Sequence, residues 1–362
     1  MLYYLTQEVF KDVHYFHIFK YITFRGFGAA ITSMLIMFLF MNKFIAYLQK
    51  IQNGGQPIRD DGPESHFKKR GTPTMGGLLM MISIFVSVIL WGDLSNSSLQ
   101  LTMFVTGSYA LLGFIDDYRK VTKRNSKGVC GKFKLGYQFI ISLVAYLWIQ
   151  KFMLSALDNK LALPIFKEVL IDLGWLYFPF IACVTIGASN AVNLTDGLDG
   201  LAIVPVMITA FCFSVIAYVV GNSIFSEYLK VHHVIGVGEL SLFLACMIGA
   251  GLGFLWYNCS PAKIFMGDTG SLAFGGSLGI VSVLTKHELV LAMVGGLFVI
   301  EALSVIVQVY YYKLSKGKRI FLMAPIHHHF EKKGWSEPMV VVRFWIISII
   351  FAIIGMSTLK IR

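Results

Sequence analysis

LLMMISIFVSVILW, residues 78–91, is apolar all round, with two serines as its only polar side chains. A strand in a membrane barrel needs roughly ten residues that alternate in polarity, and this stretch does not alternate. A helix rises 1.5 Å per residue, so an apolar run of about 17 to 26 residues crosses a hydrocarbon core about 30 Å thick. We therefore exclude a β-barrel and predict a membrane-spanning helix here.

Similar apolar runs recur along the chain. Of the 362 residues, 56% are hydrophobic and 14% are charged, whereas soluble domains carry about 25% charged residues. We find ten runs, at residues 21–48, 75–93, 99–115, 135–154, 173–189, 200–220, 240–257, 270–285, 289–313 and 339–358. No low-complexity segment or internal repeat separates them. The sequence predicts an all-α polytopic membrane protein of about ten helices, forming a single domain over residues 1–362.

The amino-terminal residues 1–20 precede the first run. They contain Glu8, Lys11 and Asp12 among aromatic side chains, and they lack the basic start, apolar core and cleavage site of a signal peptide. We expect an ordered part of the protein, such as an interfacial segment.

Basic residues distinguish the two sides of the membrane. The loops 49–74, 116–134, 190–199, 258–269 and 314–338 together hold 18 Lys and Arg residues, whereas the other loops with residues 1–20 hold 6. Basic loops stay in the cytoplasm, so we predict that both termini are periplasmic. The same bias explains the net charge of +11 without nucleic acid as a partner. The five cysteines form no disulfide framework or metal motif, which suits a reducing compartment.

The first chemically distinctive loop is PESHFKKRGTPTMGG at residues 63–77. Lys69 and its basic neighbours offer positive charge, and Thr74 offers a hydroxyl close to a helix start, where anions bind well. The alternative is a basic membrane anchor with a turn at Pro73.

The run GFIDDYRKVTKRNSKG at residues 113–128 places Asp116 and Asp117 at the inner end of the third span. Ionised carboxylates beside hydrocarbon are costly, so they indicate a function. Adjacent helical side chains diverge by about 100°, so we expect the two aspartates to have different roles. The alternative is a structural ion-pair network with basic residues such as Lys120.

The loop GASNAVNLTDGLDGLA at residues 187–202 carries no basic residue although it is assigned to the inside. Its Asn190, Asn193, Asp196 and Asp199 could bond a base and a ribose, and its glycines allow close approach of a ligand. Turn and cap chemistry at the sixth span is the alternative.

The loop WYNCSPAKIFMGDTGSLAFGG at residues 256–276 places Asp268 just before the eighth span. Magnesium is usually held by one or two carboxylates together with water and substrate phosphates. Asp268 is therefore our first candidate for a magnesium ligand, and a helix cap is the alternative.

The segment MAPIHHHFEKKGW at residues 323–335 contains His327, His328 and His329. Three consecutive histidines cannot all face one way on a helix, so they do not form a closed zinc site alone. They can donate to phosphate or transfer a proton, and an ordinary solvated loop is the alternative. In the ninth span, Glu301 and Gln308 share a helix face. A functional role for this pair and a role in hydrogen bonding between helices are equally supported.

Together these loops resemble the bacterial phospho-N-acetylmuramoyl-pentapeptide transferase family, also called translocase I, within the polyprenyl-phosphate N-acetylhexosamine-1-phosphate transferase superfamily. The paired aspartates, NLTDGLDG and MGDTG resemble the superfamily, whereas PESHFKKRGTPTMGG and APIHHHFEKKGW resemble the muramoyl-pentapeptide branch. The resemblance implies a multi-pass protein of the bacterial inner membrane whose active site faces the cytoplasm. The implied reaction converts UDP-N-acetylmuramoyl-pentapeptide and undecaprenyl phosphate to lipid I and UMP, with Mg²⁺ as cofactor. This is the first membrane step of peptidoglycan synthesis, on which cell-wall biogenesis, cell shape and cell division depend.

The resemblance also implies roles for individual residues. Asp268 would bind magnesium, Asp116 would deprotonate the lipid phosphate or act as nucleophile, and Asp117 would assist at the diphosphate and metal. The nucleoside region would contain Asn190, Asp196, Asn258 and Phe265, and the cleft would be lined by Lys69, Thr74, Lys120, Lys132 or Lys134, Gln308 and the histidines, with His327 among the catalytic residues.

Three other functions fit parts of the pattern. A sister transferase using UDP-N-acetylglucosamine would share the phosphate chemistry, although the histidine loop argues against it. A nucleotide or lipid transporter would explain ten spans, but the carboxylates gather at one membrane face and no inverted repeat is found. A purely structural membrane partner would not need three such aspartates. The oligomeric state stays open, and a homodimer is compatible with the sequence.

Overall fold

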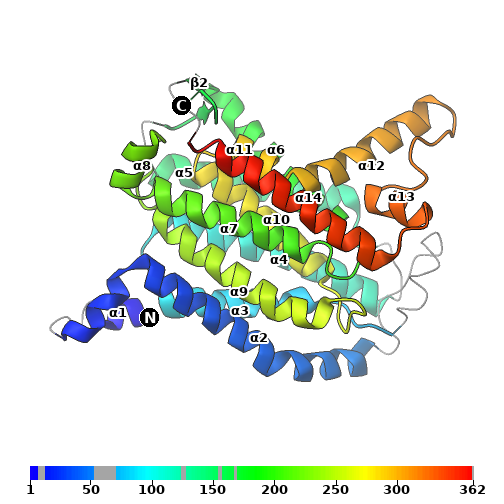
Figure 1. The fold of residues 1–362 in the computed structure, drawn as a ribbon, viewed down its shortest axis with the longest axis horizontal. Helices are drawn as coiled ribbons and strands as arrows, with labels where there is room; N and C mark the ends of the chain where they lie inside the picture. Colours follow the sequence, from blue (N-terminus) through cyan, green and yellow to red (C-terminus); the bar gives the residue numbers. More distant parts are fainter. Residues whose placement is uncertain (7–12, 53–70, 124–127, 154–156, 167–168, 361–362) are drawn as a thin grey trace.

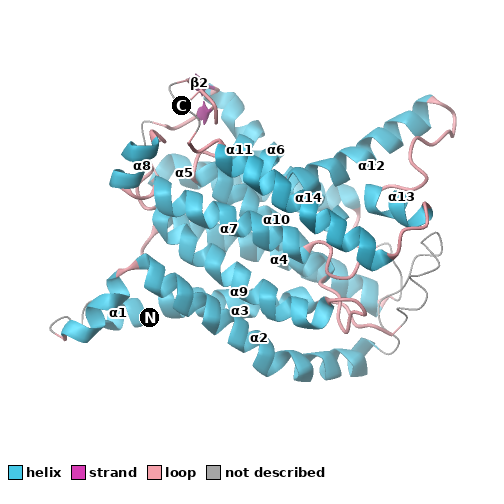
Figure 2. Cartoon of the chain, viewed as in Figure 1, coloured by secondary structure: helices cyan, strands magenta, loops and turns pink. Residues whose placement is uncertain are grey.

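The computed structural model describes residues 1–6, 13–52, 71–123, 128–153, 157–166 and 169–360. Most of them are helical (Figures 1 and 2). The long helices are α2 (Ile22–Gln52), α3 (Gly76–Trp91), α4 (Ser97–Thr122), α5 (Gly131–Phe152), α6 (Tyr177–Thr195), α7 (Ile203–Val220), α9 (Leu240–Asn258), α10 (Gly267–Leu284), α12 (Gly296–Leu314) and α14 (Glu337–Ser357). Each of the ten predicted runs overlaps at least one of these helices.

Shorter elements connect the long helices. They are α1 (Leu2–Tyr4), α8 (Ser223–Leu229), α11 (Glu288–Val294), α13 (Ile326–Lys332) and the 3₁₀ turns η2 (His14–Lys20), η4 (Gly174–Leu176) and η5 (Val237–Glu239). Strands β1 (Lys160–Ala162) and β2 (Leu170–Asp172) form an antiparallel hairpin in which Leu161 is opposite Ile171. The all-α prediction did not include this hairpin, which is too short to show a strand pattern.

Seven helices of the described chain are long and apolar enough to cross a membrane: α2, α4, α6 with η4, α7, α9 with η5, α12 and α14. Helix α3 is apolar but has only 16 residues. The predicted helical membrane architecture is therefore confirmed, whereas ten crossings remain a prediction.

The ninth predicted span, residues 289–313, is not one helix. Helix α11 ends at Val294, and α12 begins at Gly296 after Gly295. A Cβ atom at Gly296 would lie 2.6 Å from the ring of Phe351 in α14, so glycine allows the helices to approach closely at the break. From there α12 diverges from the other helices toward α13 (Figure 1).

Helix α10 forms the centre of the bundle, because every residue from Thr269 to Leu284 is buried. It packs mainly against α4 and α6. Glycine permits this packing, since a Cβ atom at Gly275 would lie 2.4 Å from the carbonyl oxygen of Ala188 and one at Gly276 would lie 2.8 Å from the ring of Tyr109. Small residues let membrane helices approach this closely. Around this centre, α9 packs against both α2 and α7.

The chain termini lie at one end of the bundle, and α13 lies at the other (Figure 1). At the α13 end the loops are joined by hydrogen bonds. The amide of Gly76 donates to the carbonyl of Phe265 at 2.9 Å, and the amide of Gly200 donates to the Asn258 side chain at 3.0 Å. A small apolar cluster that includes Leu198, Leu201 and Phe344 also packs the 196–200 loop against α14. Loops far apart in sequence therefore converge at this end.

Candidate active site

Asp117 of α4 binds the amino-terminal end of α10. Its carboxylate accepts hydrogen bonds from the amides of Asp268 and Thr269, at 3.1 and 2.9 Å, and from the Thr269 hydroxyl at 2.7 Å. A carboxylate at a helix start satisfies unpaired amides and interacts favourably with the helix dipole. Gly267 has φ +76°, and a Cβ atom there would lie 2.6 Å from Asp117 Oδ2. This position therefore requires glycine.

Asp116 and Asp268 form a closed ring with two lysines. Lys120 Nζ lies 2.6 Å from Asp116 Oδ2 and 3.0 Å from Asp268 Oδ1, and Lys134 Nζ lies 3.0 Å from Asp116 Oδ1 and 2.8 Å from Asp268 Oδ2. Asp116 is fully buried. An ionised carboxylate is stable at such a position only when it is paired, and each aspartate of the ring contacts both ammonium groups.

The loop before α5 completes the surroundings of Asp116. The amide of Val129 donates to Asp116 Oδ1 at 2.6 Å. Gly128 has φ +57°, and a Cβ atom there would lie 2.4 Å from the same oxygen. The sequence placed Gly128 and Val129 in the basic loop 116–134 but did not identify their contacts with Asp116.

The two neighbouring aspartates therefore have different partners, as the 100° divergence predicts. One oxygen from each of Asp116, Asp117 and Asp268 nevertheless lies within 4.8 Å of the other two. Three carboxylates against two ammonium groups leave one formal negative charge. Carboxylate oxygens are the ligands that Mg²⁺ prefers, so this donor set fits a divalent cation.

The structure distinguishes the two lysines that the sequence left open. Lys134 joins the ring, whereas Lys132 is exposed and no contact of its side chain is defined. Both lie in the first turn of α5, but positions two residues apart point in nearly opposite directions. The amino-terminal end of α5 thus presents Lys134, and not Lys132, to the carboxylates.

The α6 residues lie beside this cluster. Asn190 donates to Gln138 Oε1 of α5 at 3.0 Å, and Asn193 donates to the Ser271 hydroxyl of α10 at 2.8 Å. Burial, together with the charges of Asp268 and Asp117, raises the pKa of Asp196 to about 8. Asp196 therefore lies within electrostatic range of Asp117 and Asp268.

Asn258 and Phe265 connect loops. The Asn258 side chain donates to the carbonyl of Ile264 at 2.8 Å and accepts from Gly200. The amide of Phe265 donates to the carbonyl of Pro73 at 2.9 Å, and its ring is half-buried. In this structure both polar ends of Asn258 serve to hold neighbouring loops together.

Thr74 lies close to the carboxylates as well. The side chain of Gln52, at the end of α2, donates to the carbonyl of Thr74 and accepts from its amide, each at 3.0 Å. The Thr74 hydroxyl is buried and has no hydrogen-bond partner within the described part of the chain. Gln52 gave no signal in the sequence, because it lies just beyond the first predicted span, residues 21–48, and belongs to no distinctive motif. The other predicted residue of this loop, Lys69, lies outside the described residues.

The three histidines of α13 have three different partners. His327 Nδ1 lies 3.1 Å from Glu301, His328 Nδ1 lies 2.7 Å from Glu331, and His329 Nδ1 accepts from the amide of Leu322 at 3.0 Å. Burial lowers the pKa of His328. The three side chains therefore point to different neighbours, as expected for consecutive positions on a helix.

Gln308 also has a defined partner. Its side-chain oxygen accepts from the amides of Ile320 and Phe321, at 3.1 and 2.9 Å. It therefore shapes the segment that connects α12 to α13.

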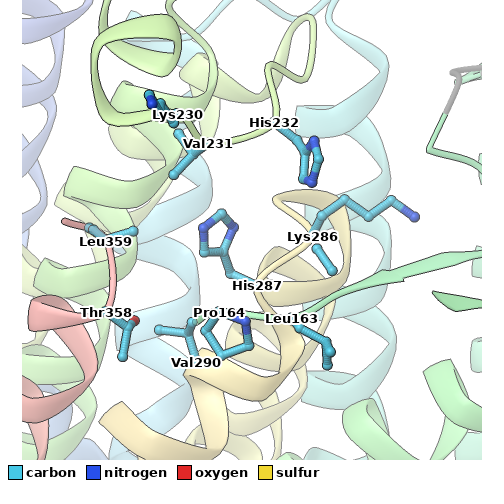
Figure 3. A pocket seen from close by; sticks show the side chains of 11 residues that line it. Leu163, Pro164, Lys230, Val231, His232, Lys286, His287, Val290, Thr358 and Leu359 are labelled. Carbon is cyan, nitrogen blue, oxygen red and sulfur yellow. The ribbon is translucent and has the colours of Figure 1, made fainter. Parts of the chain in front are cut away.

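A separate pocket lies at the end of the bundle where the carboxyl terminus is found (Figure 3). It lies between the β1 end, the α8 end, the α10–α11 connection and residues after α14, and its lining includes His232 and His287. None of the residues of the carboxylate ring contributes to it. The two sites are therefore distinct.

The carboxylate site combines the parts that phosphoryl transfer requires. Ammonium groups and a bound divalent cation stabilise negative charge that develops on transferring phosphate. The ring offers the ammonium groups of two lysines, and its carboxylates offer oxygen ligands for a divalent cation.

Comparisons with known proteins match the part of the chain that contains the carboxylate site. Residues 99–286 match the model of glycosyl transferase family 4, and residues 69–79 match signature 1 of the phospho-N-acetylmuramoyl-pentapeptide-transferases. A phospho-N-acetylmuramoyl-pentapeptide-transferase of Ruegeria pomeroyi is 58% identical over 362 residues, covering all of both chains. A protein of the same name from Ruegeria sp. strain TM1040 is 57% identical, again over both full lengths.

Proposed function

Because the chain belongs to the phospho-N-acetylmuramoyl-pentapeptide-transferase family, we propose that it converts UDP-N-acetylmuramoyl-pentapeptide and undecaprenyl phosphate to lipid I and UMP. The chain is an enzyme of peptidoglycan synthesis that transfers the phospho-sugar to a lipid carrier. The observation that carries the assignment of the site is the ring of Asp116, Lys120, Lys134 and Asp268 beside Asp117.

Mg²⁺ is the cofactor of this proposal, and Asp268 is its principal ligand. The buried oxygens of Asp116 and Asp117 lie close enough to share the same ion. When bound, the cation would supply positive charge beside the diphosphate of the donor.

The protein's own residues have separate tasks in the reaction. Lys120 and Lys134 each bridge Asp116 and Asp268, and they balance the charge of the incoming phosphates. Asp117 fixes the start of α10, and thereby the position of Asp268, through three hydrogen bonds. Asp116 faces the lipid phosphate either as a base or as a nucleophile, and both roles use a carboxylate held by Lys120, Lys134 and the Val129 amide.

The donor would occupy the region between the 196–200 loop, the 258–266 loop and α13. Asn190, Asn193, Asp196, Asn258 and Phe265 are proposed for the nucleoside side of this region. The cleft would be completed by Lys69, Thr74, Gln308, His327, His328 and His329.

The lipid substrate would enter from the side of α12. This helix is apolar, diverges from the bundle (Figure 1), and exposes Leu303, Ile306 and Tyr310. A prenyl tail could remain against this surface while its phosphate approaches Asp116. Cross-linking with a photoreactive prenyl phosphate should label α12, and labelling restricted to another helix would contradict this route.

The remaining features of the proposal concern placement. The excess of basic residues in the five site loops supports a cytoplasmic active site and periplasmic termini in the bacterial inner membrane. Ten crossings, one domain over residues 1–362 and a homodimer belong to the same proposal.

A direct assay tests the proposed reaction. Purified protein in detergent, with magnesium and undecaprenyl phosphate, should release UMP from UDP-N-acetylmuramoyl-pentapeptide and not from UDP-N-acetylglucosamine. Asp268→Ala should abolish turnover while circular dichroism shows an intact fold. Activity with the acetylglucosamine donor alone would reassign the substrate, and release of UMP by Asp268→Ala at the normal rate would remove the metal assignment.

A further inference from the structure

Glu301 is an acidic residue within a lipid-facing helix. It lies in α12, one of the helices apolar enough to cross a membrane, yet its side chain is fully buried. Ionisable groups inside membrane helices are costly and usually face a partner. The defined partner of the carboxylate is His327 Nδ1, at 3.1 Å from Glu301 Oε2. A buried carboxylate of α12 therefore reaches α13 through this one imidazole.

His327 joins α12 to the loop that follows α6. The imidazole is 1% exposed. Its other ring nitrogen, Nε2, is buried and has no hydrogen-bond partner among the residues described. A Cβ atom at Gly197 would lie 2.3 Å from this Nε2, so the absence of a side chain at Gly197 allows the ring to reach the loop. The residue before Gly197 is Asp196, which interacts electrostatically with Asp117 and Asp268.

The other two histidines are held differently. His328 pairs with Glu331 of its own short helix, and His329 accepts from a backbone amide. Only His327 of the triplet combines nearly complete burial with a ring nitrogen directed at the 196–200 loop. This combination separates His327 from its neighbours.

The group that faces Nδ1 of a histidine favours one of the two tautomers of its imidazole ring. When Glu301 is ionised, its carboxylate only accepts hydrogen bonds, and His327 then donates through Nδ1–H. The neutral imidazole then presents the lone pair of Nε2 as an acceptor. An unpaired buried acceptor is unfavourable unless a ligand satisfies it.

We propose that Glu301 is a positioning residue, which holds His327 through Nδ1 so that Nε2 accepts a hydrogen bond from a hydroxyl or N–H group of the UDP-linked donor beside the 196–200 loop. The inference rests on the proposed function. It assigns a task to a buried acid that does not touch the phosphates, and it gives His327 a task different from those of His328 and His329.

A double-mutant cycle tests this inference. Glu301→Gln keeps the size of the side chain, but its amide can donate to Nδ1 and so move the proton to Nε2. This variant should lower kcat/KM for the UDP-linked donor by about 5- to 100-fold, as expected when a buried polar group is left without its hydrogen-bond partner, and leave KM for undecaprenyl phosphate unchanged. In a His327→Ala background the same substitution should change the rate by less than about twofold.

Ser304→Ala is the matched control. Ser304 is buried one turn further along α12, and its hydroxyl donates only to the carbonyl of Glu301 within the helix. Because the alanine variant keeps the side chains of both Glu301 and His327, we expect its kcat/KM to remain within about twofold of the wild type. Thermal unfolding in detergent should be recorded for every variant. If Glu301→Gln does not fold, Glu301→Asp keeps the carboxylate on a shorter side chain and should show the same lack of additivity with His327→Ala.

The outcomes distinguish two failures. The inference would be overturned if Glu301→Gln lowered kcat/KM equally in the wild type and in the His327→Ala background, because Glu301 would then act independently. The same holds for Glu301→Asp where that variant is used. An increase in KM for undecaprenyl phosphate, with KM for the donor unchanged, would overturn it as well. No UMP release by the wild type from either sugar donor would instead refute the proposed function.

Discussion

Lys134→Met removes one ammonium group from the carboxylate ring while keeping a long unbranched side chain. Lys134 Nζ lies 3.0 Å from Asp116 and 2.8 Å from Asp268. At these distances each contact contributes about 6 kcal/mol of attraction at an effective dielectric constant of about 20. Desolvation of the lysine offsets part of this, and loss of one partner from a buried ion pair costs about 3 to 5 kcal/mol.

Much of that cost should appear in the reaction barrier, because the incoming phosphates add negative charge to two carboxylates that have lost a cation. We expect kcat for UMP release to fall roughly 10²- to 10³-fold. Lys132→Met is the matched control, since Lys132 lies two residues earlier in the same helical turn and is exposed. Its rate should stay within about twofold of the wild type.

The assay follows UMP release at saturating donor and lipid, with circular dichroism as a check that both variants are helical. Equal losses for Lys132→Met and Lys134→Met would refute the reasoning, because a general effect of basic charge near the membrane surface would then explain both. A normal rate for Lys134→Met would show that the ring is not used in turnover.

Three further predictions concern the same cluster. Thr269→Val removes the hydroxyl that donates to Asp117 at 2.7 Å but keeps both backbone amides, so kcat should fall about 10-fold; unchanged UMP release would show that the amides suffice. Gly128→Ala would place a Cβ atom 2.4 Å from Asp116 Oδ1 at a φ of +57° and should lower kcat by about 10²-fold, whereas Gly131→Ala, which meets open space, should be normal in the same assay. Chelation of divalent cations should stop UMP release, and added Mg²⁺ should restore it; turnover that persists in excess chelator would exclude a metal requirement.

Hydropathy predicted the helices because a helix that crosses the lipid core needs a long run of apolar residues. It did not predict the break at Gly295 between α11 and α12, since the apolar pattern continues without interruption. Hydropathy also underestimated the length of α4, which continues to Thr122. The charged residues at the end of this helix resemble those of a loop.

Asp116 and Asp117 were predicted from their cost in an apolar environment and Asp268 from its place at a helix start, and the structure brings the three together. The choice between Lys132 and Lys134 could not be made from sequence, because it depends on the rotation of α5 about its own axis. The contribution of Gln52 could not be predicted either, since its contacts to Thr74 are long-range and involve only backbone atoms of the partner.

The complete burial of α10 has a consequence for how this protein can diversify. Asp268 is carried by a helix whose following residues are all packed against neighbours, so we expect larger side chains to be poorly tolerated there. We therefore expect adaptation to a modified donor to arise in the surrounding loops, where side chains can change without displacing the central helix.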